Sequence, residues 1–125
     1  MILSIGIDII EISRVEGVLS RQGRRFQQRV FTADEVEYCE RRASRVSSYA
    51  ARFAAKEAVM KALGTGWSHG VRWRDIEVVR GRYGPPSIKL AGRALDRFNE
   101  IGGTSIKLSL THSRDLAMAQ VIFES

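Results

Sequence analysis

The sequence predicts an α+β fold in which a small antiparallel sheet is covered by helices, within a single domain over residues 1–125. Two observations support this prediction. Segments with strand-like alternation stand at the start of the chain and in its second half, and helical segments with capping signals lie between them. A chain of 125 residues also has room for one real core but not for a second.

The first predicted strand covers residues 1–10, and we expect it to be buried. Its apolar side chains alternate with small or polar ones, so the two kinds occupy opposite faces. Asp8 therefore projects from a face of small residues that could admit a ligand. The apolar face comprises Leu3, Ile5, Ile7 and Ile9, and the small face comprises Ser4, Gly6 and Asp8.

Two capping boxes predict the next two helices. In a capping box, a serine or threonine and a glutamate three residues later satisfy each other's backbone amides. Residues 13–16 predict a helix that ends near Gly23, and residues 32–35 predict a second helix that starts at Ala33 and runs into the region 41–45.

The stretch ARFAAKEAVMKALGTG, residues 51–66, predicts a long third helix. Ser47 or Ser48 opens it, and Gly64 or Gly66 ends it in a left-handed conformation. Beyond it, a helix and two hairpins complete the prediction. The strands cover 75–80, 87–90, 105–111 and 117–123, the first two are joined by a turn over 81–86, and a helix over 93–101 ends at Gly102 and Gly103.

Glu57 lies in the middle of an apolar stripe of the long helix. At about 100° of rotation per residue, Phe53, Ala54 and Met60 fall within about 60° of it. An ionised carboxylate in such a place costs several kcal/mol unless a cation or hydrogen-bond donors compensate it. The sequence therefore indicates an ion pair or a bound ligand at Glu57. The alternative is an exposed pair with Lys61, one turn later.

Asp8 and Glu57 are two carboxylates on rigid elements, which suits a hard divalent cation that keeps some waters and accepts phosphate oxygens, as Mg²⁺ does. The alternative for Asp8 is to cap the helix that follows it. Cys39 is the only cysteine, and the two histidines, His69 and His112, are far apart. This excludes an intramolecular disulfide and argues against a zinc site.

The net charge of +6, with arginine favoured over lysine, predicts an anionic partner: nucleic acid, a phosphorylated small molecule or an acidic protein. No apolar run approaches the roughly 20 residues that span a bilayer. The first ten residues lack the features of a secretory signal. We therefore expect no membrane role and a cytoplasmic location.

Basic side chains form two groups. Arg52 and Lys56 are one helical turn apart, close to Lys61 and to the arginines of residues 41–45, and could converge on a multiply charged phosphate compound. The alternative is a solvated helix surface. His112 ends a predicted strand and could also donate to a phosphate. Its neighbour Ser113 lacks the context of a nucleophile elbow, so we reject a serine hydrolase.

The second basic group lies on the first helix. Arg14, Arg21 and Arg25 fall within about 20° of one line if the helix continues past Gly23, and Val18 lies beside them. Such a mixed basic and apolar strip suits an acidic amphipathic partner helix. The alternative is a role in solubility alone.

Five segments together resemble the holo-[acyl-carrier-protein] synthase family of the 4′-phosphopantetheinyl transferase superfamily. The resemblance covers nearly the whole chain in order. The segments are GIDIIEISRVE at 6–16, FTADEVEYC at 31–39, ARFAAKEAVMKALGTG at 51–66, DIEVV at 75–79 and LSLTHSRDLAMAQVI at 108–122.

The resemblance implies transfer of 4′-phosphopantetheine from coenzyme A to a serine of apo acyl carrier protein, with release of adenosine 3′,5′-bisphosphate, as part of fatty acid biosynthesis. It implies that Asp8 and Glu57 bind Mg²⁺ and that Lys61 contacts and can protonate the leaving phosphate. Glu57 would accept the serine proton directly or through a water held by the metal, and the sequence leaves this choice open.

The resemblance also implies binding sites and a homotrimer whose active sites lie between subunits. The residues matching the coenzyme A site are Arg45, Arg52, Lys56, Lys61, Gly64, His112 and Ser113, with Arg42 as an alternative to Arg45. The basic residues in the segment that binds the acidic carrier protein are Arg14, Arg21, Arg24 and Arg25.

Two other functions stay open at this point. The positive charge is compatible with an RNA-binding module, although neither an aromatic RNA-binding strand nor a nucleic-acid reading helix is evident. A trimeric scaffold that has lost activity is the second possibility, and it would leave the two acids without a role.

Overall fold

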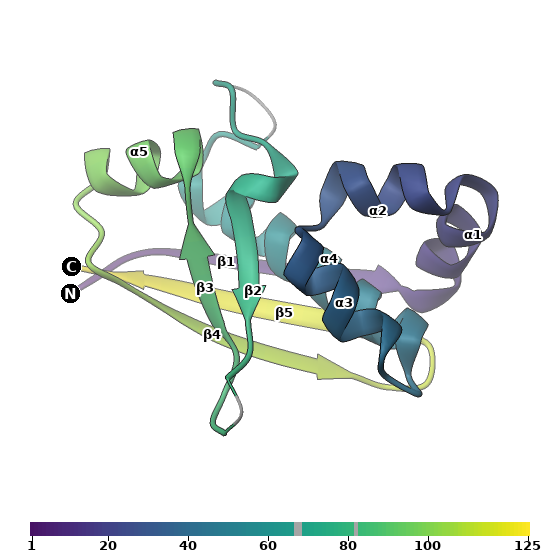
Figure 1. Cartoon of the computed structure of the whole chain (residues 1–125). Coiled ribbons are helices and arrows are strands. Elements are labelled where there is room, and N and C mark those ends of the chain that lie inside the picture. Colours follow the sequence, from purple (N-terminus) through teal and green to yellow (C-terminus); the bar gives the residue numbers. More distant parts are fainter. Residues whose placement is uncertain (67–68, 82) are drawn as a thin grey trace.

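A three-stranded antiparallel sheet and one long helix form the centre of the molecule (Figure 1). The computed structural model describes residues 1–66, 69–81 and 83–125. The sheet has the strand order β1-β5-β4, and β2 and β3 form a separate antiparallel pair. The elements are β1 Ile2–Glu11, α1 Ile12–Gln22, α2 Arg24–Val30, α3 Ala33–Glu40, α4 Arg45–Leu63, the 3₁₀ turn η1 Trp73–Asp75, β2 Ile76–Val79, β3 Ser87–Leu90, α5 Gly92–Glu100, β4 Ser105–His112 and β5 Leu116–Glu124.

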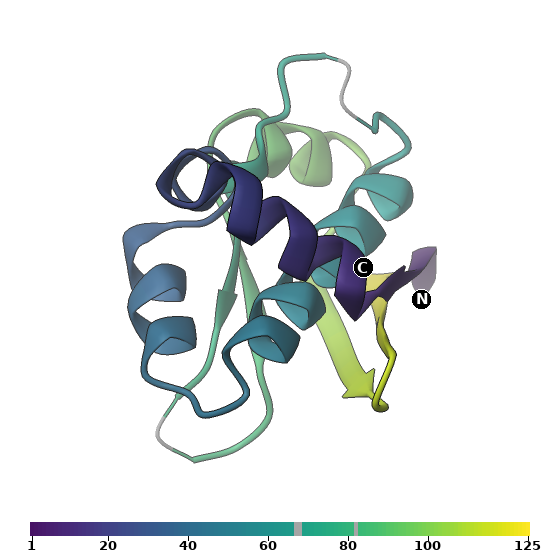
Figure 2. The same ribbon diagram turned by 90° about the vertical axis from the view of Figure 1, so that its right-hand side faces the viewer.

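The α+β class is confirmed, and the predicted strands agree with the observed ones to within one or two residues. Arg82, in the predicted turn over 81–86, lies outside the described residues. The two termini lie side by side (Figure 2), where the Met1 amino group donates to the Ser125 carbonyl oxygen at 3.3 Å. In the described part of the chain, no helix combines the length and apolar character needed to cross a membrane.

Helix α4 packs against one face of the sheet, and small side chains allow it to approach closely. Along β5, every second side chain points toward α4. Ala117, Ala119 and Val121 on this face are fully buried. On β1 the approach is closer still, because a Cβ atom at Gly6 would lie only 1.8 Å from the Ala58 carbonyl oxygen. The Ser4 hydroxyl donates to the Ala62 carbonyl oxygen at 2.7 Å.

This packing corrects the prediction for the first strand. We expected its isoleucines to be buried, but Ile5, Ile7 and Ile9 are 54%, 51% and 54% exposed. The face that packs on α4 is the small one, because only small side chains leave room for the helix. The expectation that this face admits a ligand is therefore wrong at Gly6, which α4 covers.

The helix ends show which capping signals operate. The capping box of Thr32 and Glu35 is present and α3 starts at Ala33, as predicted. The box predicted at residues 13–16 is not formed, because α1 already begins at Ile12. Helix α4 begins at Arg45, earlier than expected, and ends at Gly64 with a left-handed φ of 77°.

The predicted end of the first helix is confirmed at Gly23. Its φ of 51° ends α1, and α2 starts directly afterwards at Arg24. The line of Arg14, Arg21 and Arg25 required one continuous helix, so that interpretation is wrong for Arg25.

Candidate active site

Asp8, Glu57 and Lys61 lie together where β1 passes the second half of α4. The Lys61 ammonium group donates to a carboxylate oxygen of Asp8 at 3.0 Å and to the Ile7 carbonyl oxygen at 3.0 Å. The close approach at Gly6 brings Asp8, two residues later on β1, within reach of this helix. Lys61 thus forms its ion pair with Asp8 on β1. The alternative pair with Glu57, one turn earlier on α4, does not form.

The three side chains form a partly open, charged site. The Asp8 side chain is 16% exposed and the Lys61 side chain 55% exposed. Burial raises the pKa of Glu57, the negative charge of Asp8 raises it further, and Lys61 opposes both effects. The two carboxylates are therefore close enough to repel each other.

This donor set fits a hard divalent cation. Two carboxylates that repel each other in a half-buried site are stabilised by a cation held between them, and Mg²⁺ takes one or two carboxylates together with waters and phosphate oxygens. Among residues 1–66, 69–81 and 83–125, no cluster of three or more histidine, cysteine or acidic side chains offers a fuller set of protein ligands. Asp8 and Glu57 would leave most coordination positions to water and substrate.

Lys56 faces the opposite way and lies in the core, with a fully buried side chain. Its ammonium group donates to Glu35 at 2.7 Å, to the Trp73 carbonyl oxygen at 3.2 Å and to the Ile76 carbonyl oxygen. Burial lowers the pKa of Lys56, and the negative charge of Glu35 acts against this. All three ammonium hydrogens are used inside the protein, so the predicted contact of Lys56 with coenzyme A does not agree with this structure.

Glu35 is a central residue, although its place in the sequence predicted only a helix cap. One carboxylate oxygen accepts from Lys56 and from the Thr32 amide at 2.9 Å, and the other accepts from the Val78 amide at 2.9 Å. These bonds join α3, α4 and β2. Lys56 and the Val78 amide come from distant segments, so the sequence held no signal for this role of Glu35 beyond its helix cap.

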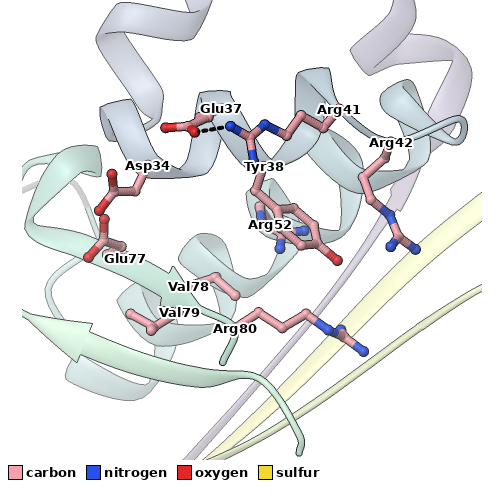
Figure 3. A pocket seen from close by; sticks show the side chains of 10 residues that line it. All are labelled: Asp34, Glu37, Tyr38, Arg41, Arg42, Arg52, Glu77, Val78, Val79 and Arg80. Atoms are coloured by element: carbon pink, nitrogen blue, oxygen red, sulfur yellow. Dashed lines mark hydrogen bonds and ion pairs between the residues drawn. The ribbon is translucent and has the colours of Figure 1, made fainter. Parts of the chain in front are cut away.

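Arg52 lines a pocket of about 470 Å³ between α3, α4 and β2 (Figure 3). Asp34 and Glu77 lie at one end of it, whereas Arg42 and Arg80 extend at the other. The full lining comprises Asp34, Glu37, Tyr38, Arg41, Arg42, Arg52, Glu77, Val78, Val79 and Arg80.

Of the two alternatives near the start of α4, Arg42 lines this pocket and Arg45 does not. The Arg45 guanidinium group donates to the Glu40 carboxylate at 2.7 Å and lies over the Tyr49 ring. Glu40 also accepts from the Tyr49 hydroxyl at 2.6 Å, and this bond, with Arg45, lowers the pKa of Glu40. Arg45 is thus held in a network that stabilises the α3–α4 junction.

The remaining residues predicted to bind coenzyme A lie elsewhere. Gly64 forms the end of α4 and lines a small pocket with Arg93 and Arg97. His112 ends β4, and Ser113 lies in the turn to β5, where its hydroxyl accepts from the Leu116 amide at 3.3 Å. Since β5 lies between β4 and β1, the backbone at His112 is about 10 Å from that of β1.

The basic face of α1 borders a second groove, of about 280 Å³, between α1 and α4. Arg14 and Arg21 line it together with Val18, Phe26 and Phe53. Beyond Gly23, Arg24 lines a different groove beside α3. The structure thus brings two of the four predicted partner-binding arginines to one mixed basic and apolar surface.

The sequence model described as ACPS, 4′-phosphopantetheinyl transferase superfamily, matches residues 4–121. The chain belongs to this superfamily. The holo-[acyl-carrier-protein] synthase of Solibacter usitatus is 47% identical over 125 residues, which are 100% of both chains. The resemblance drawn from the five sequence segments is confirmed, and with it the enzyme class, phosphopantetheinyl transferase.

Solved structures show the same fold for this phosphopantetheinyl transferase. The crystal structure of the synthase from Neisseria meningitidis has a TM-score of 0.89 and 33% identity, with 100% of both chains covered. The Helicobacter pylori synthase in complex with coenzyme A has a TM-score of 0.83 and 30% identity, covering 96% of this chain and 99% of the other. These findings favour the transferase over the RNA-binding module.

Proposed function

We propose that this chain transfers 4′-phosphopantetheine from coenzyme A to a serine of apo acyl carrier protein, giving holo acyl carrier protein and adenosine 3′,5′-bisphosphate. The observation that supports this most directly is the meeting of Asp8, Glu57 and Lys61. The names of the relatives, and the coenzyme A in the Helicobacter pylori complex, support the substrates.

Asp8 and Glu57 would hold Mg²⁺, which when bound neutralises charge on the diphosphate and makes the attacked phosphorus more electrophilic. The serine oxygen forms a bond to the phosphorus that bears pantetheine. The bond from this phosphorus to the bridging oxygen breaks, and that oxygen leaves with adenosine 3′,5′-bisphosphate. The two acids orient the substrate for this displacement.

Lys61 stabilises the leaving phosphate. An ammonium group has three hydrogens, and Asp8 and Ile7 engage two of them. The third is available to a phosphate oxygen, because more than half of this side chain is exposed. Lys61 donates this hydrogen bond, or the proton itself, as charge develops on the departing oxygen.

Glu57 serves as the base. Its carboxylate lies beside Asp8 and Lys61, at the point where the serine hydroxyl would attack, and this position suits a group that accepts a proton in the reaction. The proton of the serine hydroxyl passes to Glu57 directly or through one water.

Coenzyme A and the carrier protein would use the two surfaces described above. Arg42 and Arg52 in the pocket between α3, α4 and β2 are suited to a phosphate, and Gly64 stays a predicted contact. The predicted contacts of Arg45, His112 and Ser113 would depend on a neighbouring subunit or a shifted side chain. The groove of Arg14, Val18 and Arg21 would accept an acidic amphipathic helix of the carrier protein, whereas Arg24 and Arg25 would contact its rim.

A homotrimer with active sites between subunits is part of the proposal. The isoleucine face of β1 supports an assembly of this kind, since Ile5, Ile7 and Ile9 are each about half exposed and lie on one face of the strand. A cytoplasmic location stays a prediction from the sequence.

Mass spectrometry of apo acyl carrier proteins incubated with the chain, coenzyme A and Mg²⁺ tests the function. We expect the carrier to gain the mass of phosphopantetheine. Lys61→Met should lower the rate by about 10²- to 10⁴-fold, the range for loss of a proton-transfer group. Lys89→Met, an exposed lysine on β3, is the matched control and should leave the rate unchanged.

Two outcomes would contradict this function. One is the absence of a mass gain on several carrier proteins. The other is a Lys61→Met variant as fast as the wild type. Calorimetry of coenzyme A binding distinguishes the transferase from an inactive scaffold. The transferase should bind coenzyme A in a Mg²⁺-dependent manner, and the scaffold should not.

A further inference from the structure

Tyr38, on α3, lies against two guanidinium groups in the pocket between α3, α4 and β2 (Figure 3). The central carbon of the Arg52 guanidinium group is 4.0 Å from the centre of the tyrosine ring, and that of Arg42 is 5.4 Å away. Both distances are within the range of a cation–π interaction. Two positive charges thus share one aromatic ring.

Arg52 is unusual because it is buried, at 4% exposure, without an acidic partner. Buried arginines are normally paired with carboxylates. Among the described residues, no carboxylate lies within ion-pair distance of Arg52, and one of its terminal nitrogens donates to the Ser48 carbonyl oxygen at 3.3 Å. Its Nε atom is buried and has no hydrogen-bond partner in that part of the chain.

An aromatic partner has a different effect from an acidic one. A carboxylate would fix Arg52 but would also neutralise its charge and compete with an incoming anion. A ring face fixes the guanidinium plane and leaves its charge and its donors available. The ring does not satisfy the buried Nε donor, so holding Arg52 in this place has a cost in free energy.

The acids of the pocket do not cancel this charge. Glu37 is engaged by Arg41 at 2.6 Å, and Glu77 accepts from the Thr32 hydroxyl at 2.5 Å. Asp34 and Glu77 lie at the end of the pocket away from Arg42 (Figure 3). An anion would therefore be favoured only at the end formed by Tyr38 and the arginines.

We propose that Tyr38 is a positioning residue that holds Arg52, and with it Arg42, ready for the phosphomonoester at the 3′ position of the coenzyme A ribose. This rests on the proposed function, in which the diphosphate belongs with Asp8, Glu57 and Lys61. Arg52 precedes Glu57 by five residues, so it projects about 140° away around α4. The 3′-phosphate is the other anionic group of coenzyme A, and Tyr38 therefore contributes to selecting coenzyme A over 3′-dephospho-coenzyme A.

Steady-state kinetics of Tyr38→Leu and Tyr38→Phe with both compounds test this role. Tyr38→Leu removes the aromatic face and should raise the KM for coenzyme A by about 3- to 30-fold, the range for a desolvated cation–π contact. Its kcat, and its KM for 3′-dephospho-coenzyme A, should stay within about twofold of the wild-type values. Tyr38→Phe keeps the ring, so it is the matched control and should behave as the wild type.

A double variant shows whether Tyr38 acts through Arg52. In the background of Arg52→Met, Tyr38→Leu should cause little further loss, whereas independent roles would give additive losses. A merely structural role would weaken both compounds equally. Tyr38→Met replaces Tyr38→Leu if the leucine variant does not fold.

Equal KM rises for the two compounds, or a Tyr38→Leu variant that discriminates between them as the wild type does, would overturn the proposal and leave the transferase function intact. Absence of transfer by the wild type would instead contradict the proposed function. Calorimetric binding of both compounds is measured in parallel, so the role of Tyr38 is decided even if no carrier protein is modified.

Discussion

At Glu57, burial and the charge of Asp8 act in the same direction on one carboxylate. Its pKa in the folded protein is therefore above the value in the unfolded chain. Ionisation of Glu57 then costs stability. The cost is absent below the unfolded pKa, appears as the pH rises, and is complete above the folded pKa.

Glu57→Gln should consequently stabilise the metal-free protein at pH 7 while removing transferase activity. We expect a rise in Tm of about 1 to 3 °C at pH 7, which disappears near pH 3, where both side chains are neutral. Thermal unfolding in the presence of a chelator measures this. Glu16→Gln, at an exposed position of α1, is the control and should show no such pH-dependent gain. A destabilised Glu57→Gln variant at pH 7 would contradict the argument.

The sequence revealed Glu57 more readily than Lys56, although the two are adjacent. Helical periodicity alone places Glu57 among apolar side chains, so its need for a cation could be predicted. Lys56 was expected on the surface because its partners, Glu35 and the carbonyl groups of Trp73 and Ile76, come from distant segments. Only the tertiary fold brings these acceptors to one point.

Element ends show the same division between local and distant causes. The cap at Thr32 is local, formed with Glu35 three residues later, and was predicted. The start of α1 is not local, since the Ile12 amide donates to the Asp115 carbonyl oxygen at 2.9 Å, in the turn after β4. This long-range bond holds the first residue of α1 in place directly after the end of β1. No pattern within the local sequence could have indicated it.

The contact between β1 and α4 depends on Gly6. A methyl group there would meet the Ala58 carbonyl oxygen at 1.8 Å, and a backbone atom cannot swing aside as a side chain can. Gly6→Ala should therefore force the two elements apart, lower the free energy of unfolding by about 1 to 3 kcal/mol or more, and displace Asp8. Urea unfolding and the transfer assay measure the two effects.

Gly17→Ala is the matched control on α1. Its new methyl group would meet only the flexible end of Arg21, at 3.1 Å, and alanine is favoured over glycine within a helix by about 0.5 to 1 kcal/mol. We expect this variant to be as stable as the wild type or more so. A Gly6→Ala variant with an unchanged unfolding midpoint would show that β1 and α4 can separate without cost.

In the whole molecule, as far as the described residues go, the β1-β5-β4 sheet is covered on one face only. Opposite α4, the strand register places Ile5 beside Ile122 and Ile9 beside Met118, so apolar side chains of β1 and β5 share the open face. The alternation on β1 predicted which isoleucines share a face. The prediction that the isoleucine face is the buried one was wrong, because the close approach of α4 at Gly6 leaves room only for the small side chains.

Ile7, at the centre of this open face, tests the proposed trimer. A lysine there would place a charge inside an apolar interface, and a buried unpaired charge costs several kcal/mol. We expect the wild type to sediment at three times the chain mass of 14.0 kDa and Ile7→Lys to sediment as a monomer. Leu95→Lys, on α5 and 39% exposed, is the control and should stay trimeric.

If active sites lie between subunits, Ile7→Lys should also lose transfer although Asp8, Glu57 and Lys61 are unchanged. A monomeric wild type that transfers phosphopantetheine at full rate would show that one chain holds the complete site, and the open isoleucine face would then need another partner.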